Sequence, residues 1–473
     1  MIKGLETVYP SVLIAAPQGH SGKTLISIAL CAALKQRGLV VQPFKKGPDY
    51  IDPSWLTAAA GRGCRNLDAV LMPEEALLGS FQRSCQGADV AIIEGAMGLY
   101  DGLDSGDQGS TAQIARLLHS PVIMVVNTAR MTQSVAAMLS GYQHFQPDIN
   151  IAGVILNNVS GSRHEHKLVT AIERHCGIPV LGSVPREDSL FITERHLGLV
   201  PYREAGGNSF INQIHHRLEG RLDLDGVLDI ARRAKALYAA VIPAPKKKTT
   251  VVRVGVMFDK AFTFYYPENL EALVQAGAEL VFIDSLHEHE LPDIEGLYIG
   301  GGFPEAFLRE LEANSQLRDH IAQSIEDYLP VYAECAGLMY LCQRIRWRDQ
   351  RSEMVGVIPA EVEIGPKPQA HGYVLVEVTG ENPLFPIGLK FWGHEFHHSA
   401  LVGSGDFKFA YRLLRGKGID NTMDGIIYKN VLATYTHLHA LGVPQWAEAF
   451  VSLAYQHKHS LPELDPTRWL VPK

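Results

Sequence analysis

The segment VLIAAPQGHSGKT at residues 12–24 decides the fold of the first half of this chain. A short apolar run leads into a glycine-containing loop, and Lys23 and Thr24 then open an apolar helical segment. Glycines let backbone N–H groups close around phosphate oxygens, the helix N-terminus adds positive potential, the lysine reaches the β- and γ-phosphates, and the threonine ligates Mg²⁺. The segment therefore predicts a phosphate-binding loop. The residues expected to hold the nucleotide are Gly19, Ser21, Gly22, Lys23 and Thr24.

The pattern of strand, loop and helix continues along the first half of the chain. Pro17 stands where the motif usually has its first glycine, so a chance glycine-rich turn is the competing explanation; the order of strand, loop and helix favours the phosphate loop. Apolar runs separated by helix-like segments indicate a parallel sheet covered on both faces, with ligands at the carboxyl ends of its strands. These runs lie at residues 39–45, 88–93, 121–126, 151–156 and 178–182.

Polar residues stand at the predicted strand ends, where a phosphate-loop enzyme holds its metal and its ligands. Glu94 directly follows an apolar run, and we expect it to ligate Mg²⁺ together with Thr24 and Asp49; a solvated strand-end glutamate is the plainer explanation. Asn157 is expected to contact the nucleotide base, with a simple turn as an equally good reading. Lys46, beside another lysine, is expected to hold phosphate or an anionic substrate, unless the two form an ordinary surface pair.

Composition excludes several classes of function. The chain has 473 residues, a formal net charge of −8 and an isoelectric point near 6.2, which argue against a nucleic-acid partner. No run approaches the ~20 apolar residues that a membrane helix needs. The six cysteines lack metal-type spacing, and the N-terminus lacks a secretory apolar segment. We therefore expect a reduced, cytoplasmic protein with no membrane partner.

The strand pattern lapses around residues 186–250, and a second α/β pattern follows. Residues 241–250 hold two prolines and three lysines, which is typical of a linker. We therefore expect one domain at 1–240, a linker at 241–250 and a second domain at 251–473. The elements expected nearby are helices at 211–218 and 227–237 and strands at 252–258, 279–283, 296–299 and 329–335.

Cys335 is the candidate nucleophile of the second half. It follows an apolar strand and precedes a predicted helix at 336–344, so it stands on a sharp strand-to-helix turn that exposes it to substrate. Cys342 is expected to be a small buried hydrophobe. The glycine turn at 300–302 can supply backbone donors for an oxyanion.

A thiol nucleophile needs a base, and histidines gather late in the chain. His437 and His439 alternate along an extended segment and share one face, so either can approach Cys335. Any one of these histidines is more often structural than catalytic, so the cluster carries more weight than its members. The members are His394, His397, His398, His437 and His439.

These motifs together resemble the cobyrinate a,c-diamide synthases, glutamine-hydrolysing enzymes that amidate acetate side chains of corrin-type macrocycles. The resemblance covers essentially the full length of the chain. It rests on APQGHSGKT (16–24), PFKKGPDYIDP (43–53), RNLD (65–68), EGAMGLYDG (94–102), FTFYYPEN (262–269), GGGFPE (300–305), YAEC (332–335) and GHEFH (393–397).

The resemblance implies an α/β fold with an N-terminal P-loop domain similar to dethiobiotin synthetase and a C-terminal class I-like glutamine amidotransferase domain. It implies that Cys335 attacks L-glutamine with His437 as base, and that the released ammonia passes internally to the N-terminal site. There ATP, with Mg²⁺, would phosphorylate a carboxylate of the tetrapyrrole, and ammonia would displace the phosphate. The implied substrate residues are Lys46, Tyr50 and Asp101, the last in a loop that bears on which carboxylates are amidated.

Departures from the family pattern leave alternatives open. In the broad class of these amidotransferases a glutamate commonly stands two residues after the catalytic histidine, where this chain has His439. The partner of His437 is therefore open, and a Cys–His pair without a third residue is one alternative. Ala333 replaces a glycine that is usual in the broad class, although Ala-Glu-Cys is familiar in the corrin-amidating branch. The atypical segment 440–446 leaves the macrocycle open: cobyrinate first, with hydrogenobyrinate, sirohaem, sirohydrochlorin or nickel-sirohydrochlorin as alternatives. A non-catalytic ATP-dependent tetrapyrrole carrier or a partition-type ATPase switch is the alternative from another class; the retained Cys335 opposes the carrier, and the large second domain opposes the switch. A homodimer is one open oligomeric state.

Overall fold

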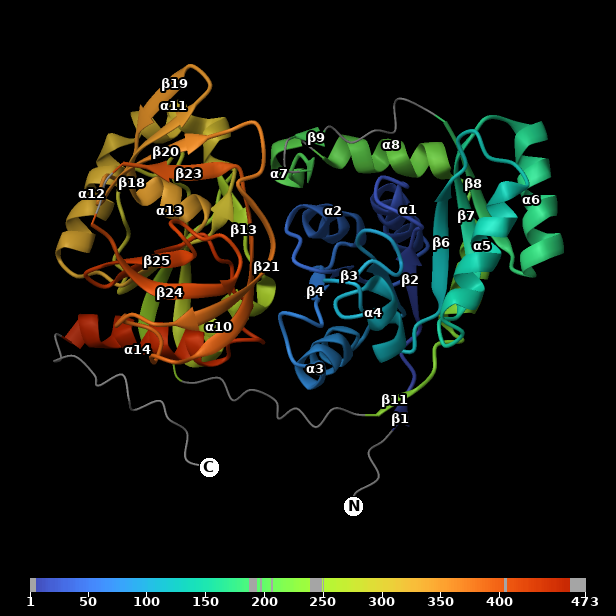
Figure 1. Ribbon diagram of the computed structural model, residues 1–473, viewed down its shortest axis with the longest axis horizontal. Coiled ribbons are helices and arrows are strands. Elements are labelled where there is room, and N and C mark those ends of the chain that lie inside the picture. The colour runs from blue at the N-terminus through green and yellow to red at the C-terminus, as the bar shows by residue number, and fades with distance from the viewer. Residues whose placement is uncertain are drawn as a thin grey trace. The chain divides into compact units, whose positions relative to one another are not determined.

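The computed structural model describes residues 6–186, 194–195, 198–205, 207–238, 249, 251–403 and 406–459 (Figure 1). The chain divides into two compact units, Met1–Ile242 and Pro243–Lys473. The linker predicted at 241–250 lies outside the described residues, apart from Thr249.

The N-terminal unit is built on a seven-stranded parallel sheet in the order β4-β3-β5-β2-β6-β7-β8. Its strands are almost wholly buried, which is why their sequences read as continuous apolar runs. The predicted parallel sheet is confirmed. The strands of the unit are β1 (Glu6–Thr7), β2 (Ser11–Ala15), β3 (Val41–Lys46), β4 (Arg65–Leu67), β5 (Val90–Glu94), β6 (Val122–Asn127), β7 (Ile151–Val159), β8 (Val180–Pro185), β9 (Glu194–Arg195), β10 (Gly198–Leu199) and β11 (Leu237–Tyr238).

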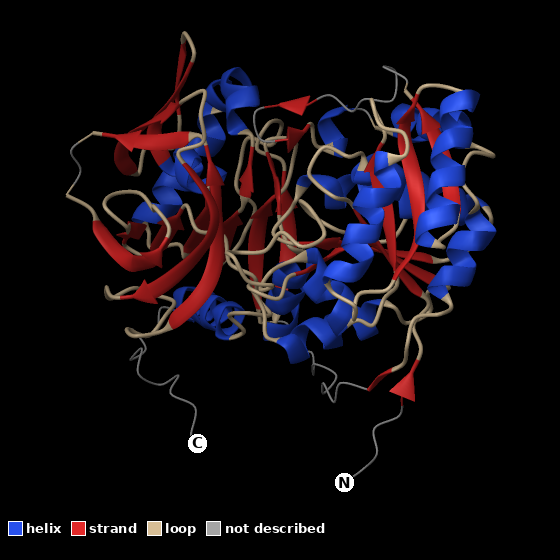
Figure 2. Ribbon diagram, turned by 45° about the vertical axis from the view of Figure 1, so that its right-hand side comes forward, coloured by secondary structure: helices blue, strands red, loops and turns tan. Residues whose placement is uncertain are grey.

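Helices cover both faces of this sheet (Figure 2). Right-handed crossovers place α1 and α2 on one face and α3 to α6 on the other, because the chain steps in opposite directions across the sheet. The helix predicted at 227–237 is wrong in its second half: α9 ends at Ala231, and Leu237 and Tyr238 pair with β1. The helices are α1 (Lys23–Gln36), α2 (Ile51–Ala60), α3 (Glu74–Ser84), α4 (Thr111–Leu117), α5 (Ser134–Phe145), α6 (Ser162–Cys176), α7 (Tyr202–Ala205), α8 (Asn208–Leu218) and α9 (Leu224–Ala231).

The C-terminal unit is built on a nine-stranded mixed sheet in the order β14-β12-β15-β17-β26-β25-β24-β21-β22. The first five strands pair in parallel and the rest pair antiparallel. A four-stranded sheet, β19-β18-β20-β23, and a two-stranded pair, β13-β16, complete it. The strands are β12 (Val252–Met257), β13 (Phe262–Phe264), β14 (Ala278–Ile283), β15 (Gly296–Ile299), β16 (Gly301–Gly302), β17 (Val331–Glu334), β18 (Cys342–Trp347), β19 (Gln350–Glu353), β20 (Ile358–Ile364), β21 (Ala370–Val378), β22 (Lys390–His397), β23 (Ser399–Val402), β24 (Lys408–Arg415), β25 (Met423–Tyr428) and β26 (Val431–Thr434).

Two apolar cores lie on the two faces of the nine-stranded sheet. Alternate residues of β15 and β17 enter different cores, so Leu297 and Val331 pack on one side and Tyr298 and Tyr332 on the other. The helix predicted at 336–344 is too long: it ends at Leu341, and the next residues start β18. The helices are α10 (Pro267–Ala276), η2 (Pro304–Phe307, a 3₁₀ turn), α11 (Leu308–Ala313), α12 (Ser315–Glu326), α13 (Ala336–Leu341) and α14 (Gln445–His459).

No helix within the described part of the chain combines the length and the apolar character needed to cross a membrane.

Candidate active site

The predicted phosphate-binding loop joins β2 to α1 at the centre of the N-terminal sheet. Gly22 has φ +95°, and a Cβ at this position would lie 2.2 Å from Asn157 Nδ2, so only glycine fits here. The Asn157 amide donates a 3.0 Å hydrogen bond to the Ser21 carbonyl, and the Ser21 hydroxyl donates to the Gln18 carbonyl at 3.0 Å. Asn157, at the end of β7, therefore braces the loop from outside; a contact with the base stays a prediction.

The Lys23 side chain is held by a hydrogen bond to another segment. Its ammonium donates to the Met97 carbonyl at 2.7 Å, which ties the loop to the glycine-containing segment 95–102 after β5. Burial, then the charge of Lys45, lowers the pKa of Lys23 to about 8. A phosphate would replace the Met97 carbonyl with a stronger, charged acceptor.

A buried ionic cluster lies directly beside Thr24. The Lys45 ammonium donates to Asp52 Oδ2 at 2.5 Å and to Glu94 Oε1 at 2.7 Å, and it lies 3.5 Å from Asp49 Oδ2. The Thr24 hydroxyl donates to Glu94 Oε1 at 2.7 Å. Three carboxylates thus face one buried ammonium group: Lys45 is 3% exposed and Glu94 fully buried, whereas the side chains of Asp52 and Asp49 are 15% and 31% exposed.

Asp52 is a site residue that our sequence reasoning did not assign. Its Oδ2 accepts a hydrogen bond from the Thr24 hydroxyl at 3.2 Å, next to Glu94. Asp49, the predicted metal ligand, uses Oδ1 to accept from the backbone N–H groups of Ile51 and Asp52 and so caps α2. Burial and the charge of Asp52 raise the pKa of Asp49 to about 6. The three-residue spacing of Asp49 and Asp52 is the sequence feature that could have indicated a role for Asp52.

The residues of this cluster fit a divalent cation. Burial raises the pKa of Glu94 to about 7, and Glu94 Oε2 has no hydrogen-bond partner within the described residues. A buried carboxylate oxygen beside a threonine hydroxyl is the donor set that Mg²⁺ takes in phosphate-loop sites, where phosphates and waters supply the remaining ligands. Within the described residues, no group of three or more His, Cys, Asp or Glu side chains is arranged to hold a metal ion.

The predicted substrate residues surround the same strand ends. Lys46 ends β3, and burial lowers its pKa. Tyr50 immediately precedes α2. Asp101 is exposed, and its Oδ2 accepts a 2.8 Å hydrogen bond from the Gly98 N–H, which shapes the segment that also holds Lys23. The contacts of these three residues with a substrate stay predictions.

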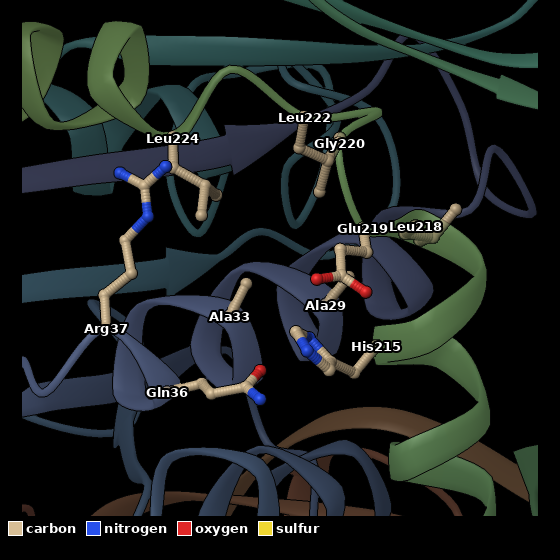
Figure 3. Close-up of a pocket in the computed structure, with 10 residues that line it drawn as sticks. All are labelled: Ala29, Ala33, Gln36, Arg37, His215, Leu218, Glu219, Gly220, Leu222 and Leu224. Atoms are coloured by element: carbon tan, nitrogen blue, oxygen red, sulfur yellow. The ribbon is translucent and has the colours of Figure 1, made fainter.

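A cavity of about 300 Å³ in the same unit lies away from these residues (Figure 3). It opens between the second half of α1, α8 and residues 219–224, with Arg37, His215 and Glu219 on its walls. The phosphate-binding loop is at the opposite, N-terminal end of α1. The cavity is therefore separate from the loop that we expect to hold the nucleotide.

In the C-terminal unit, Cys335 stands on the predicted strand-to-helix turn. It follows β17 and precedes α13, with φ 48° and ψ −97°, a left-handed conformation that is rare for a residue with a side chain. Its N–H donates to the Thr434 carbonyl at 2.8 Å, which fixes the turn to β26. The expectation that this turn exposes the cysteine is not met in the structure, because Cys335 is buried, with 5% of its surface exposed. Its role as a nucleophile stays a prediction.

His437 is the histidine that reaches Cys335. Burial opposes a charge on its ring, but the neighbouring side chains of Cys335 and Glu334 outweigh burial and raise the pKa of His437 to about 10. An imidazolium beside a thiol is placed to give its proton to a group that leaves from a carbon bound to the sulfur. A Cβ at Gly301 would lie 2.6 Å from His437 Cε1, so the glycine turn is needed to admit this ring.

The other histidines of the cluster have different neighbours. His394 stacks on His437 with ring centroids 4.9 Å apart, and burial lowers the pKa of His394 well below 6.5. His397 stacks on Tyr435 at 3.7 Å. The glycine turn at 300–302 was expected to supply backbone donors for an oxyanion. In the structure the Gly300 N–H donates to the Tyr265 hydroxyl, so it is not available as such a donor.

Both units match known protein families. Residues 12–200 match the CobQ/CobB/MinD/ParA nucleotide binding domain, and residues 253–444 match the CobB/CobQ-like glutamine amidotransferase domain. Over 446 residues the chain is 47% identical to a cobyrinate a,c-diamide synthase of Magnetococcus marinus, covering 93% of this chain and 96% of that protein. The chain belongs to the cobyrinate a,c-diamide synthase family.

Archaeal members of the family are also similar over nearly their whole length. The Methanosarcina acetivorans cobyrinate a,c-diamide synthase is 42% identical and covers 95% of this chain and 96% of its own length. The Archaeoglobus fulgidus enzyme is 41% identical and covers 97% of this chain and 100% of its own length. The family, the two domain types and the class of glutamine-dependent ligase inferred from the motifs are thereby confirmed.

Proposed function

We propose that this chain converts the a- and c-acetate carboxylates of the corrin-type macrocycle cobyrinate into amides, with L-glutamine as nitrogen donor and ATP as energy source. The observation that carries the proposal is the presence, on one chain of this family, of a phosphate-binding loop with its buried acidic cluster and of a strained cysteine paired with a histidine. Neither centre alone makes an amide from a carboxylate: one activates the acid, and the other supplies the nitrogen.

At the C-terminal centre the Cys335 sulfur attacks the side-chain amide carbon of glutamine. His437 gives its proton to the leaving nitrogen, and ammonia departs as the carbon becomes a thioester. Water, deprotonated by the now neutral His437, then hydrolyses the thioester to glutamate and frees the thiolate. The high pKa of His437 keeps the proton in place for the first step.

At the N-terminal centre a substrate carboxylate oxygen attacks the γ-phosphorus of ATP and ADP leaves. Ammonia then attacks the acyl phosphate carbon, and phosphate departs with the oxygen, leaving the amide. Lys23 neutralises the transferred phosphate, and Lys46 attracts the carboxylate. Thr24, Glu94 and either Asp52 or Asp49 would hold Mg²⁺, which supplies charge neutralisation on the phosphates. Tyr50 and Asp101 are the residues we assign to the macrocycle.

The compartment we propose is the cytoplasm, as expected from the sequence. All six cysteines are free thiols, which agrees with a reducing compartment and is required of Cys335.

Mass spectrometry of reaction products tests the proposal. The protein is incubated with ATP, Mg²⁺, glutamine and, separately, cobyrinate, hydrogenobyrinate, sirohydrochlorin, nickel-sirohydrochlorin and sirohaem. Each carboxylate that becomes an amide lowers the mass by about one unit, and we expect two such steps on cobyrinate. Two steps on a different macrocycle would keep the chemistry and replace the substrate.

The Cys335→Ala variant separates the two centres in the same assay. We expect it to lose glutamine-driven amidation and to keep amidation when ammonia is added. A wild-type protein that neither hydrolyses glutamine nor changes the mass of any macrocycle would reject the enzyme and favour a tetrapyrrole carrier.

A further inference from the structure

The sequence leaves the orientation of His437 unexplained. The position two residues later, where glutamine amidotransferases of the broad class commonly have a glutamate, holds His439. The contacts of His439 run elsewhere. Its Nδ1 accepts from the Leu441 N–H at 3.2 Å, its Nε2 lies 3.7 Å from Glu268 Oε2, and its ring packs on Tyr266 at 4.5 Å. His439 therefore does not orient His437.

A carboxylate that faces His437 lies next to the nucleophile itself. Glu334 Oε2 lies 3.5 Å from His437 Nδ1, and both side chains are buried, with 1% and 2% exposed. This leaves Nε2 of the ring for the thiol of Cys335, since the ring also hydrogen bonds to that cysteine. The order carboxylate, Nδ1, Nε2, sulfur is the arrangement of a catalytic triad.

Glu334 is itself held rigidly. Its Oε2 accepts from the Tyr298 hydroxyl at 3.0 Å, and its Oε1 accepts from the Tyr332 hydroxyl at 3.1 Å and from the Leu438 N–H at 3.1 Å. Burial, then the Glu334 charge, raises the pKa of both tyrosines well above the ordinary value, so both remain hydrogen-bond donors.

These contacts connect the two segments that carry the reacting groups. Glu334 and Tyr332 lie on the same face of β17, and the Leu438 N–H belongs to the residue after His437. A carboxylate held in this way fixes both the distance and the rotation of the imidazole relative to the turn at Cys335. Burying a glutamate costs folding free energy, and an apolar side chain at this position would cost less.

We propose that Glu334 is the positioning residue of His437 and does what a glutamate two residues after the histidine commonly does in the broad class of glutamine amidotransferases. Its negative charge stabilises the imidazolium, and its fixed oxygen holds the Nδ1–H so that Nε2 serves the thiol. The effect that we expect on glutamine hydrolysis rests on the proposed function. The effect that we expect on the reactivity of the Cys335 thiol does not rest on it.

The Glu334→Gln variant, with Glu268→Gln as matched control, tests this role. Both changes neutralise a buried glutamate beside a buried histidine of the same unit, but only the first faces His437. The first measurement is the rate of Cys335 alkylation by iodoacetamide against pH, read from the Cys335 peptide. It needs neither glutamine nor a macrocycle, so its result is independent of the proposed function.

We expect the part of the rate profile above neutral pH, where the His437 imidazolium loses its proton, to move to lower pH in Glu334→Gln. Removing the anion of Glu334 makes this imidazolium easier to deprotonate. The other groups facing His437 are Cys335 and His394, and neither is changed. In glutamine hydrolysis kcat should fall roughly tenfold or more, with KM little altered. Glu268→Gln should leave both profiles as in the wild type.

Equal profiles for Glu334→Gln and the wild type would overturn the inference, and so would equal effects of the two variants. If Glu334→Gln does not fold, Glu334→Asp and Tyr298→Phe replace it. The aspartate keeps the charge but withdraws it from Nδ1, so an intermediate shift is expected. The Tyr298→Phe variant loosens the carboxylate and should lower kcat more than it raises KM; an unchanged kcat in both would equally reject the role.

Discussion

The Thr24 hydroxyl donates a 2.7 Å hydrogen bond to Glu94 Oε1 and so joins the end of the phosphate-binding loop to the end of β5. The two residues meet because β2 and β5 are neighbouring parallel strands, with Ile14 opposite Glu94 in the register. Parallel neighbours bring their carboxyl ends to one edge, where Thr24 follows after the loop. This hydrogen bond is therefore a direct consequence of the order of strands.

Replacing Glu94 with glutamine should abolish ATP-dependent chemistry without affecting the cysteine centre. The amide keeps the shape but removes the charge available to Mg²⁺, so ammonia-driven amidation should fall on the order of a hundredfold. Glutamine hydrolysis, measured alone, should stay within about twofold of the wild type. The exposed Glu75→Gln on α3 is the control. Ammonia-driven amidation that survives in Glu94→Gln would remove Glu94 from the metal site.

Replacing Lys45 with methionine should destabilise the N-terminal unit, and Mg²⁺ should partly reverse the loss. The change leaves the buried Glu94 and the half-buried Asp52 without their ammonium, at a cost of about 3–5 kcal/mol in the free energy of unfolding. A divalent cation bound between the same carboxylates would recover part of that cost. Urea denaturation with and without Mg²⁺ measures it. Lys35→Met, at an exposed position of α1, should change the free energy by less than about 0.5 kcal/mol and show no dependence on Mg²⁺.

The convergence of Thr24 and Glu94 could be predicted from the sequence, because continuous apolar runs fix which residues end parallel strands. The choice between Asp49 and Asp52 could not. Both lie at the start of α2, and only the direction of each side chain decides that Asp49 caps the helix while Asp52 faces Thr24. Such directions depend on how the helix packs, which a spacing does not encode.

The cysteine centre shows the same division. The turn at Cys335 was predictable from a strand followed by small residues, and His437 was one of two candidate bases within a cluster of five histidines. The role of Glu334 could not be predicted from the sequence. A glutamate at a strand end next to a nucleophile looks like part of the nucleophile motif, and the segment it contacts, at Leu438, lies about a hundred residues further along the chain. The end of α13 at Leu341 was missed because Cys342 to Arg344 are compatible with either a helix or a strand.

His394 should make stability fall on the acid side of neutrality. Its pKa in the folded chain is held well below 6.5 by burial, then by His437 and His371, so the folded chain keeps it neutral while the unfolded chain binds a proton below about pH 6.5. The stability it contributes is therefore present above that pH and lost as pH falls, with a slope of up to about 1.4 kcal/mol per pH unit.

The His394→Gln variant isolates this effect. Its melting temperature should decline less steeply than that of the wild type between about pH 6.5 and pH 5, because the proton uptake on unfolding is removed. His287→Gln, at an exposed site beside Asp284, should keep the wild-type slope. If the curves of His394→Gln and the wild type run parallel, His394 is already protonated in the folded chain.

Replacing Gly22 with alanine should disable nucleotide binding while leaving the unit folded. The new Cβ would meet Asn157 Nδ2 at 2.2 Å in a backbone with φ +95°, so the loop must open and the Asn157 bond to Ser21 must break. Binding of MgATP to the wild type should raise its melting temperature by mass action, and this shift should vanish in the variant.

Gly141→Ala is the matched control: it lies in α5, where no described atom is within 4 Å of the added Cβ. It should keep the full MgATP shift and, as a helix position, raise stability by roughly 0.5–1 kcal/mol. An equal MgATP shift in Gly22→Ala would show that the nucleotide does not use this loop.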